Sequence, residues 1–308
     1  MTHRRIVVTG GAGFIGHHLV RKLLEMGCHV LAIDNFVRGN TRYLPEHERL
    51  SVQKIDVRDG KVRGVVADFA PDTIYHLAAN HFIPDCIKDP VGTVGVNLLG
   101  TQNLLTIAED QSVSRFVFAS TADVYAASDE KHTEDSPFGS SNIYGVSKVC
   151  GESLVRLAGH RIETTQFQVV RLFNVYGPEE TNPHVIPDII VGLKSGGRLA
   201  LGDLEPLRDY VYVTDVVDAL IRAGQYRGKV ATFNIGTGSP ASVRDIVASI
   251  ERILGRHIEV VTDPAKLRKI DRFRLVGDVS RAYKELEWKP AYSLEEGLRQ
   301  LLAAEGII

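Results

Sequence analysis

Tyr144 and Lys148 are the pair of residues whose types and spacing most directly suggest a reaction. They lie four positions apart in Tyr144-Gly-Val-Ser-Lys148, so a helix would present the phenol and the ammonium on one face. The apolar run before them ends in Ser120-Thr121, which adds a hydroxyl. The lysine charge, together with the cation of a nearby hydride acceptor, would favour the tyrosinate and lower the phenol pKa from about 10. Tyr144 could then remove a proton from a substrate hydroxyl while a hydride leaves, with Thr121 as the hydrogen-bonding partner. The alternative is a packed tyrosine beside a surface lysine.

A glycine-rich turn predicts the hydride acceptor. The segment Thr9-Gly-Gly-Ala-Gly-Phe-Ile-Gly16 follows an apolar run and leads into an amphipathic run. A turn of this kind between a strand and a helix lets a pyrophosphate approach the backbone at the helix N-terminus. About twenty residues further on, the apolar run Val30–Ile33 ends in Asp34, whose carboxylate would bind the adenosine ribose hydroxyls and repel a 2′-phosphate. We therefore expect NAD rather than NADP.

Apolar and amphipathic runs alternate along the first half of the chain, which predicts strands and helices in turn. The expected strands are 6–9, 30–33, 50–55, 73–77, 116–120 and 168–172, and the expected helices lie near 14–26, 61–69, 91–110 and 142–157. Such alternation predicts an α/β fold of the Rossmann type, a doubly wound parallel sheet with helices on both faces.

After Pro178 the pattern breaks into shorter elements separated by prolines and glycines. This is typical of a smaller C-terminal lobe that covers the carboxyl edge of the sheet, where ligands bind in such folds. We expect residues 1–173 to form the NAD-binding domain, with contributions from about 209–238. Residues 174–308 would form the substrate-binding lobe.

Composition excludes several classes of protein. The 308 residues carry a net charge of −2, which gives no signal for nucleic-acid binding. No apolar stretch approaches the eighteen or so residues that span a bilayer, and the chain enters a strand too early for a signal peptide. Cys28, Cys86 and Cys150 are odd in number and, like the histidines, show no metal-ligand spacing. We expect a cytoplasmic protein without a bound metal.

Further segments complete an ordered series of motifs along the chain. They are Asp56-Val57, His76-Leu-Ala-Ala79, Asn97, Arg171-Leu-Phe-Asn-Val-Tyr-Gly-Pro178, Arg208-Asp-Tyr-Val-Tyr-Val213, Arg268 ten residues before Asp278, and Leu286-Glu-Trp-Lys-Pro290. Over essentially its whole length the chain resembles the extended short-chain dehydrogenase/reductases, specifically the NAD-dependent enzymes that act on nucleotide-diphosphate sugars. It is similar to their UDP-galactose and UDP-glucuronate 4-epimerases.

The resemblance assigns roles to individual residues. It implies a catalytic set of Thr121, Tyr144 and Lys148. It implies cofactor contacts from Gly10, Gly13, Phe14, Ile15, Gly16, Asp34, Asn35, Asp56, Val57, Leu77, Ala78, Ala79, Asn97, Tyr144 and Lys148. It implies contacts with the sugar nucleotide from Phe82, Cys86, Thr121, Asp123, Asn174, Val185, Arg208 and Arg268, in which the two arginines grip the diphosphate. Phe82 and Cys86 depart from the residues common in the family, which points to an unusual hexose.

The residues after Thr121 bear on the reaction. Dehydratases of the family carry Asp-Glu there and decarboxylases usually Ser-Glu, whereas this chain has Ala122-Asp123. Without an acid at 122, a 4,6-dehydratase is disfavoured because the leaving hydroxide has no proton donor. We expect epimerisation of an NDP-hexose at C4, with 4-ketosugar reduction or UDP-glucuronate decarboxylation as alternatives. The residues do not decide between uracil and guanine as the base of the sugar nucleotide. A cofactor-binding protein without turnover is disfavoured by the intact catalytic set.

Assembly is the last expectation. In relatives the helix through Asn97 and the helix with Tyr144 pair with their copies in a second subunit. The first of these helices holds more apolar side chains than one sheet face needs, namely Val96, Leu98, Leu99, Leu104, Leu105 and Ile107. We expect a homodimer, and burial within a single chain is the alternative.

Overall fold

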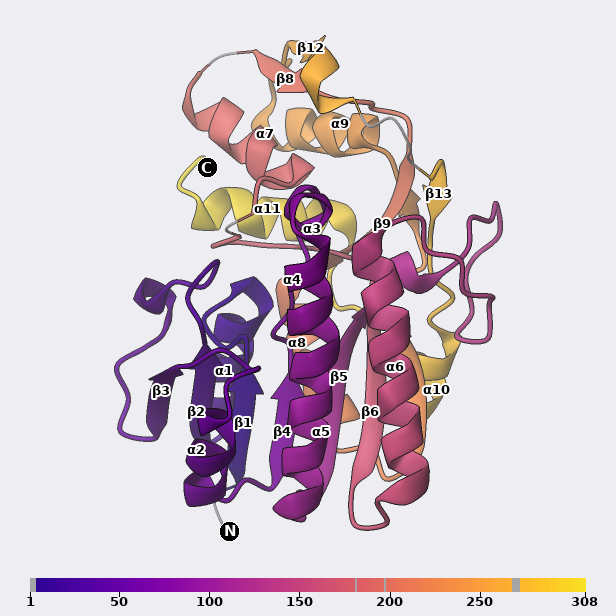
Figure 1. The fold of residues 1–308 in the computed structure, drawn as a ribbon. Helices are drawn as coiled ribbons and strands as arrows, with labels where there is room; N and C mark the ends of the chain where they lie inside the picture. The colour runs from indigo at the N-terminus through magenta and orange to yellow at the C-terminus, as the bar shows by residue number, and fades with distance from the viewer. Residues whose placement is uncertain (1–3, 181, 197, 268–271) are drawn as a thin grey trace.

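A seven-stranded parallel sheet forms the centre of the molecule (Figure 1). This computed structural model describes residues 4–308 apart from 181, 197 and 268–271. The strand order is β10-β6-β5-β4-β1-β2-β3 and every neighbouring pair is parallel. The order reverses between β1 and β4, which is where such sheets open a crevice for a ligand. The strands are β1 Arg5–Thr9, β2 His29–Asp34, β3 Leu50–Lys54, β4 Thr73–His76, β5 Arg115–Thr121, β6 Gln166–Leu172 and β10 Val230–Ile235.

Alternate residues of the central strands enter two separate cores, one on each face of the sheet. In β1, Ile6 and Val8 belong to the first core and Val7 to the second. Burial on both faces explains why these strands read as continuous apolar runs. The helices are α1 Phe14–Glu25 and α8 Val213–Ala223 on the first face, and α2 Lys61–Phe69, α5 Gly100–Asp110 and α6 Ile143–Arg161 on the second. The predicted doubly wound sheet is confirmed.

β10 is a strand of this sheet that the sequence analysis did not predict. It pairs with β6, and both β10 and α8 fall within 209–238, the range expected to contribute to the first domain. A later segment also packs here, although we had placed it in the lobe. Ala282, Leu286 and Trp288 join the core of the first face, and the Trp288 indole donates a hydrogen bond to the Asp215 carbonyl at 3.0 Å.

The remaining elements form a smaller lobe with its own core above the carboxyl ends of the sheet (Figure 1). β9 is its central strand and pairs with β7, β11 and β13. The strands are β7 Asn174–Tyr176, β8 Leu199–Leu201, β9 Leu207–Tyr212, β11 Pro240–Ala241, β12 Val260–Thr262 and β13 Arg274–Leu275, and the helices are α7 Val185–Lys194, α9 Val243–Leu254 and α11 Leu294–Ala304, with α10 Ser280–Leu286 below them on the sheet.

The helix expected over 91–110 is interrupted. It consists of α4 Pro90–Val94, a π-helical segment Gly95–Leu99 and then α5, and it follows a short helix, α3 Ile83–Lys88. A single π turn inside an α-helix often marks a functional position, because it shifts the side chains that follow around the helix axis. Here it contains Asn97.

Candidate active site

The glycine turn brings the N-terminus of α1 against the end of β4. Gly10 has φ +69°, and a Cβ there would lie 2.8 Å from the Ala78 nitrogen. A Cβ on Gly16 would lie 2.0 Å from the Gly10 carbonyl oxygen. Only glycine fits such close approaches. Gly13 is the N-cap of α1, and Phe14 and Ile15 begin the helix, so the end of α1 faces the crevice without a capping side chain. This geometry fits the pyrophosphate of a dinucleotide.

Asp34 ends β2 and holds the same turn. Its Oδ2 accepts a hydrogen bond from the Ala12 N–H at 3.1 Å and its Oδ1 accepts one from the Phe36 N–H at 2.8 Å. Burial raises the pKa of this carboxyl, and the backbone hydrogen bonds oppose that rise. Asp34 therefore fixes the turn in addition to presenting a negative charge beside it.

We expect Asp34→Asn to narrow the preference for NAD over NADP by roughly tenfold, about 1.4 kcal/mol. The amide keeps the size of the side chain and one acceptor oxygen but removes the charge that repels a 2′-phosphate. Calorimetric titration of the protein with each cofactor measures the ratio of dissociation constants. Asp68→Asn, an exposed carboxylate on α2, should leave the ratio unchanged. Equal affinities in the unmutated protein would show that Asp34 does not face the ribose.

The segments that follow β2 and β3 are joined by a hydrogen bond and held by an ion pair. Asn35 donates a hydrogen bond to Asp56 at 3.1 Å, and Arg58 binds both Asp56 oxygens, at 2.8 and 2.9 Å. These contacts hold the pKa of Asp56 far below its usual range. Val57 packs beneath Gly100, where a Cβ would come within 2.6 Å of a Val57 methyl. Asn35, Asp56 and Val57 thus lie together beside the carboxyl ends of β2 and β3.

The wall behind the turn is organised by His76. Its Nδ1 lies 2.7 Å from the Thr9 hydroxyl and its Nε2 lies 3.0 Å from the Thr101 hydroxyl. Burial lowers the pKa of His76 to about 3, so the ring is neutral at pH 7. The Leu77 N–H donates to the Thr9 carbonyl at 3.1 Å, which places Leu77, Ala78 and Ala79 against the glycine turn.

Asn97 is oriented toward the protein. It accepts a hydrogen bond from the Asn80 N–H at 2.7 Å and donates to the Asn80 carbonyl and to the Ser147 hydroxyl, both at 2.9 Å. The side chain is buried. Asn97 thus ties the loop after β4 to α6, and its predicted contact with the cofactor stays a prediction.

Thr121, Tyr144 and Lys148 come together at the carboxyl end of β5. The Asn142 side chain caps α6 by accepting from the Gly145 N–H at 2.9 Å. A Cβ on Gly145 would lie 2.5 Å from the Asp123 carbonyl, so the glycine lets α6 approach the segment after β5. The Thr121 hydroxyl lies near the Tyr144 phenol and acts to lower its pKa. Lys148 is buried one turn further along α6, with its Nζ 4.3 Å from the centre of the Phe118 ring.

Burial dominates the electrostatics of this set. We expected Lys148 to lower the pKa of Tyr144, but burial, Asp123 and Cys86 raise it, against the effect of the Thr121 hydroxyl. Burial also lowers the pKa of Lys148 to about 7, opposed by Glu152. The expected lowering rested on Lys148 together with the cation of a bound cofactor, so it stays a prediction for the cofactor-bound protein, whereas burial raises the pKa of Tyr144 in the chain by itself. A lowering would need a cation from a bound ligand.

A buried ion pair lies behind the catalytic set and was missed by the sequence analysis. Arg171 binds both oxygens of Glu152 at 2.7 and 2.8 Å, and both residues are fully buried. The Ser120 hydroxyl donates to Glu152 at 2.6 Å, and Arg171 also donates to the Tyr125 hydroxyl at 2.8 Å. The pair joins β5, β6 and α6 directly beneath Thr121 and Lys148. The signal was Glu152 itself, four residues after Lys148 on the same helix face.

The loop that carries Phe82 and Cys86 faces the lobe. The Cys86 thiol is buried and donates to the Asn80 carbonyl at 3.4 Å. The Phe82 ring lies 5.9 Å from the ring of His184, which immediately precedes Val185 at the start of α7. The loop with Phe82 therefore approaches the start of α7, Val185 packs against the core of the lobe, and the thiol of Cys86 bonds within its own loop.

The remaining predicted substrate contacts lie on the lobe. Asn174 is exposed in β7, next to Tyr210 of β9. Arg208 of β9 donates to the Leu207 carbonyl at 2.9 Å. Arg268 lies outside the described residues.

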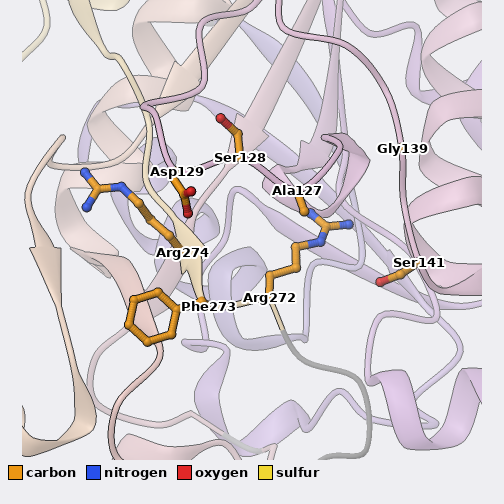
Figure 2. A pocket seen from close by; sticks show the side chains of 8 residues that line it. All are labelled: Ala127, Ser128, Asp129, Gly139, Ser141, Arg272, Phe273 and Arg274. Carbon is orange, nitrogen blue, oxygen red and sulfur yellow. The ribbon is translucent and has the colours of Figure 1, made fainter.

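Arg272 is a cationic side chain next to these predicted contacts that the sequence analysis did not select. Its Nη2 donates to the carbonyl of Asp123, a predicted substrate contact, at 3.1 Å. Arg272 and Arg274 line a cavity of about 320 Å³ (Figure 2). Within the described part of the chain, Arg272 Nη1 and Arg274 Nε are buried without a hydrogen-bond partner. The cavity is therefore suited to an anion and lies near Asp123, two residues after Thr121. The other residues that line it are Ala127, Ser128, Asp129, Gly139, Ser141 and Phe273.

The fold and this site define a dinucleotide-binding α/β protein in which a tyrosine and a lysine of one helix lie under a second lobe. A protein-family model described as GDP-mannose 4,6 dehydratase matches residues 7–301. The chain belongs to this family, within the extended short-chain dehydrogenase/reductases, as its motifs predicted. The family match by itself does not select the reaction.

Individual relatives are similar over nearly the whole chain. A UDP-glucose 4-epimerase from Mycolicibacterium smegmatis is 34% identical over 304 residues, with 96% of each chain covered. A GDP-6-deoxy-D-mannose reductase from Pseudomonas aeruginosa is 30% identical, with 97% of this chain and 96% of the relative covered. A structure of a UDP-glucuronic acid 4-epimerase from Bacillus cereus, in complex with UDP-glucuronic acid and NAD, is 27% identical with a TM-score of 0.88, and the match covers 98% of this chain and 99% of that chain.

Proposed function

We propose that this protein is an NAD-dependent epimerase that inverts C4 of a nucleotide-diphosphate hexose through a transient 4-keto sugar. The observation that carries the proposal is the meeting of Thr121, Tyr144 and Lys148 at the carboxyl edge of the sheet, where only β4 separates β5 from β1 and the glycine turn that follows it. The epimerase relatives described above support it.

The chain's own residues suit the two half-reactions. The glycine turn and Asp34 hold the cofactor, with Asn35, Asp56, Val57 and the Leu77–Ala79 wall around it. When bound, NAD accepts the hydride from C4 and later returns it, and its cationic ring favours the tyrosinate. Tyr144 takes the proton of the C4 hydroxyl as the carbonyl forms and gives it back after the sugar has turned. Thr121 orients that oxygen by a hydrogen bond, and Lys148 supports the tyrosinate when it is charged.

The sugar nucleotide occupies the crevice between sheet and lobe in this proposal. Arg208 and Arg268 hold the diphosphate, because planar guanidinium groups match phosphate oxygens. Phe82, Asp123, Asn174 and Val185 surround the sugar side of the crevice. Ala122 offers no acid for the loss of water, which supports epimerisation over 4,6-dehydration.

The fate of the hydride during turnover tests the proposal. The purified protein should carry NAD, identified by mass spectrometry, and should convert one member of a panel of UDP- and GDP-hexoses without any net absorbance of reduced nicotinamide. The panel also identifies the base. Stoichiometric consumption of added NADH or NADPH would replace the proposal by 4-ketosugar reduction, and release of carbon dioxide would replace it by decarboxylation.

We further propose a homodimer in the cytoplasm, formed through the outer faces of α4, α5 and α6, which pack side by side (Figure 1). Four of the six apolar residues named for this face are buried in the chain's own core, namely Val96, Leu104, Leu105 and Ile107. Leu99, another of the six, is exposed. Further exposed apolar side chains are Val91 in α4 and a stripe of Val146, Cys150 and Leu157 along α6. No helix in the described ranges is long and apolar enough to cross a membrane.

Light scattering should give about twice 33.9 kDa at micromolar concentration. Leu157→Lys, which puts a charge in the stripe on α6, should shift the protein toward the monomer. Val191→Lys, at a similarly exposed position on α7 in the lobe, should not. A monomeric unmutated protein would refute the proposed interface.

A further inference from the structure

Two histidines and a glutamate meet on the side of α1 away from the catalytic set. His17 and His18 directly follow the glycine turn, and Glu179 lies in the loop after β7. Each offers a ligand atom, and these atoms all lie within 4.8 Å of one another. The sequence analysis expected no metal, because two adjacent histidines have no ligand spacing and Glu179 is distant in the chain.

The hydrogen bonds of His17 leave its Nε2 atom without a hydrogen-bond donor. Nδ1 lies 2.9 Å from the Gly13 carbonyl oxygen, which can only accept, so Nδ1 carries the proton. Nε2 is then an acceptor. It is buried without a hydrogen-bond partner among the described residues, although Glu179 Oε2 lies 3.0 Å away. Two acceptors face each other at this distance, which costs free energy unless a cation lies between them.

The side chain of His17 is fully buried, and an imidazole whose Nδ1 carries the proton offers Nε2 as a metal ligand.

His18 and Arg21 make the remaining contacts at this cluster. His18 Nε2 donates to the Pro178 carbonyl at 3.1 Å, and its ring centre lies 4.3 Å from that of His17. Arg21 binds Glu179 at 2.6 and 3.2 Å. The Arg21 side chain is about one-third exposed and can turn into solvent. A carboxylate also has lone pairs beyond those that a guanidinium occupies.

We propose that His17, His18 and Glu179 form a binding site for a zinc-class divalent cation, with water as a further ligand. Two imidazoles and one carboxylate are a common zinc ligand set with one open position. The ion would join the first turn of α1 to the loop after β7 and thus link the cofactor turn to the lobe. It has no part in the proposed hydride transfer.

Metal titration tests the site. Chelator-treated full-length protein should bind one Co²⁺ per chain with visible d–d absorption, and Zn²⁺ should displace it and raise the unfolding temperature. His17→Gln and Glu179→Gln should each weaken binding by roughly tenfold or more. His160→Gln, an exposed histidine on α6, should bind like the unmutated protein.

The variant Arg21→Gln distinguishes a metal site from a simple ion pair between Arg21 and Glu179. Removal of the competing cation should tighten metal binding, whereas a site stabilised only by Arg21 and Glu179 would gain nothing from metal. The proposal is overturned if no cobalt absorption develops, or if His17→Gln binds Zn²⁺ as tightly as the unmutated protein.

Discussion

Tyr144→Phe is expected to lower turnover by roughly a hundredfold or more, with NAD still bound. The substitution keeps the ring and its packing but removes the phenol oxygen that takes the proton from the sugar hydroxyl in the proposed reaction. Steady-state conversion of the NDP-hexose, with the bound cofactor measured on the same sample, separates a catalytic loss from a binding loss.

A matched control is Tyr283→Phe, on an exposed tyrosine of α10, which should be fully active. Near-normal turnover in Tyr144→Phe would remove this residue from the mechanism. Loss of NAD together with activity would instead indicate that Tyr144 acts mainly in cofactor binding.

Arg171→Met is expected to destabilise the fold by about 3–5 kcal/mol. The substitution leaves the fully buried Glu152 carboxylate without its bidentate partner, and such a charge is costly in the core. Urea unfolding of the two proteins measures the difference.

Arg156→Met is the control, since Arg156 is more than one-third exposed and contacts the same carboxylate at 3.1 Å. It should cost no more than about 1 kcal/mol. The double variant Glu152→Leu with Arg171→Met should be more stable than Arg171→Met alone, because neither buried charge is then left unpaired. Equal, small effects of the two arginine variants would show that the buried pair does not stabilise the fold.

The sequence predicted the six strands of the first half because both faces of the sheet are buried, so each strand reads as an apolar run. Val230–Ile235 was missed, since its place in the sheet depends on pairing with β6 across the intervening lobe segments. The π-helical segment at Asn97 was also missed. An apolar pattern over 91–110 cannot distinguish a continuous α-helix from one that contains a single wider turn.

For the site, spacing was enough to place Tyr144 and Lys148 on one helix face and Thr121 near them. It could not give the direction of the pKa of Tyr144, because that depends on desolvation in the folded chain. The pair Glu152 and Arg171 and the cluster of His17, His18 and Glu179 join residues from different elements. Such contacts appear only when the chain is folded.

A C4-deuterated substrate tests the proposed reaction most directly. The NDP-hexose that the protein converts is incubated in ordinary water with no added nucleotide cofactor, and the product is examined by NMR and mass spectrometry. We expect a product of inverted configuration at C4 that keeps the deuterium on that carbon, because the hydride leaves to bound NAD and returns to the same atom. A product that has lost the deuterium from C4, or one that lacks a carbon, would contradict the account.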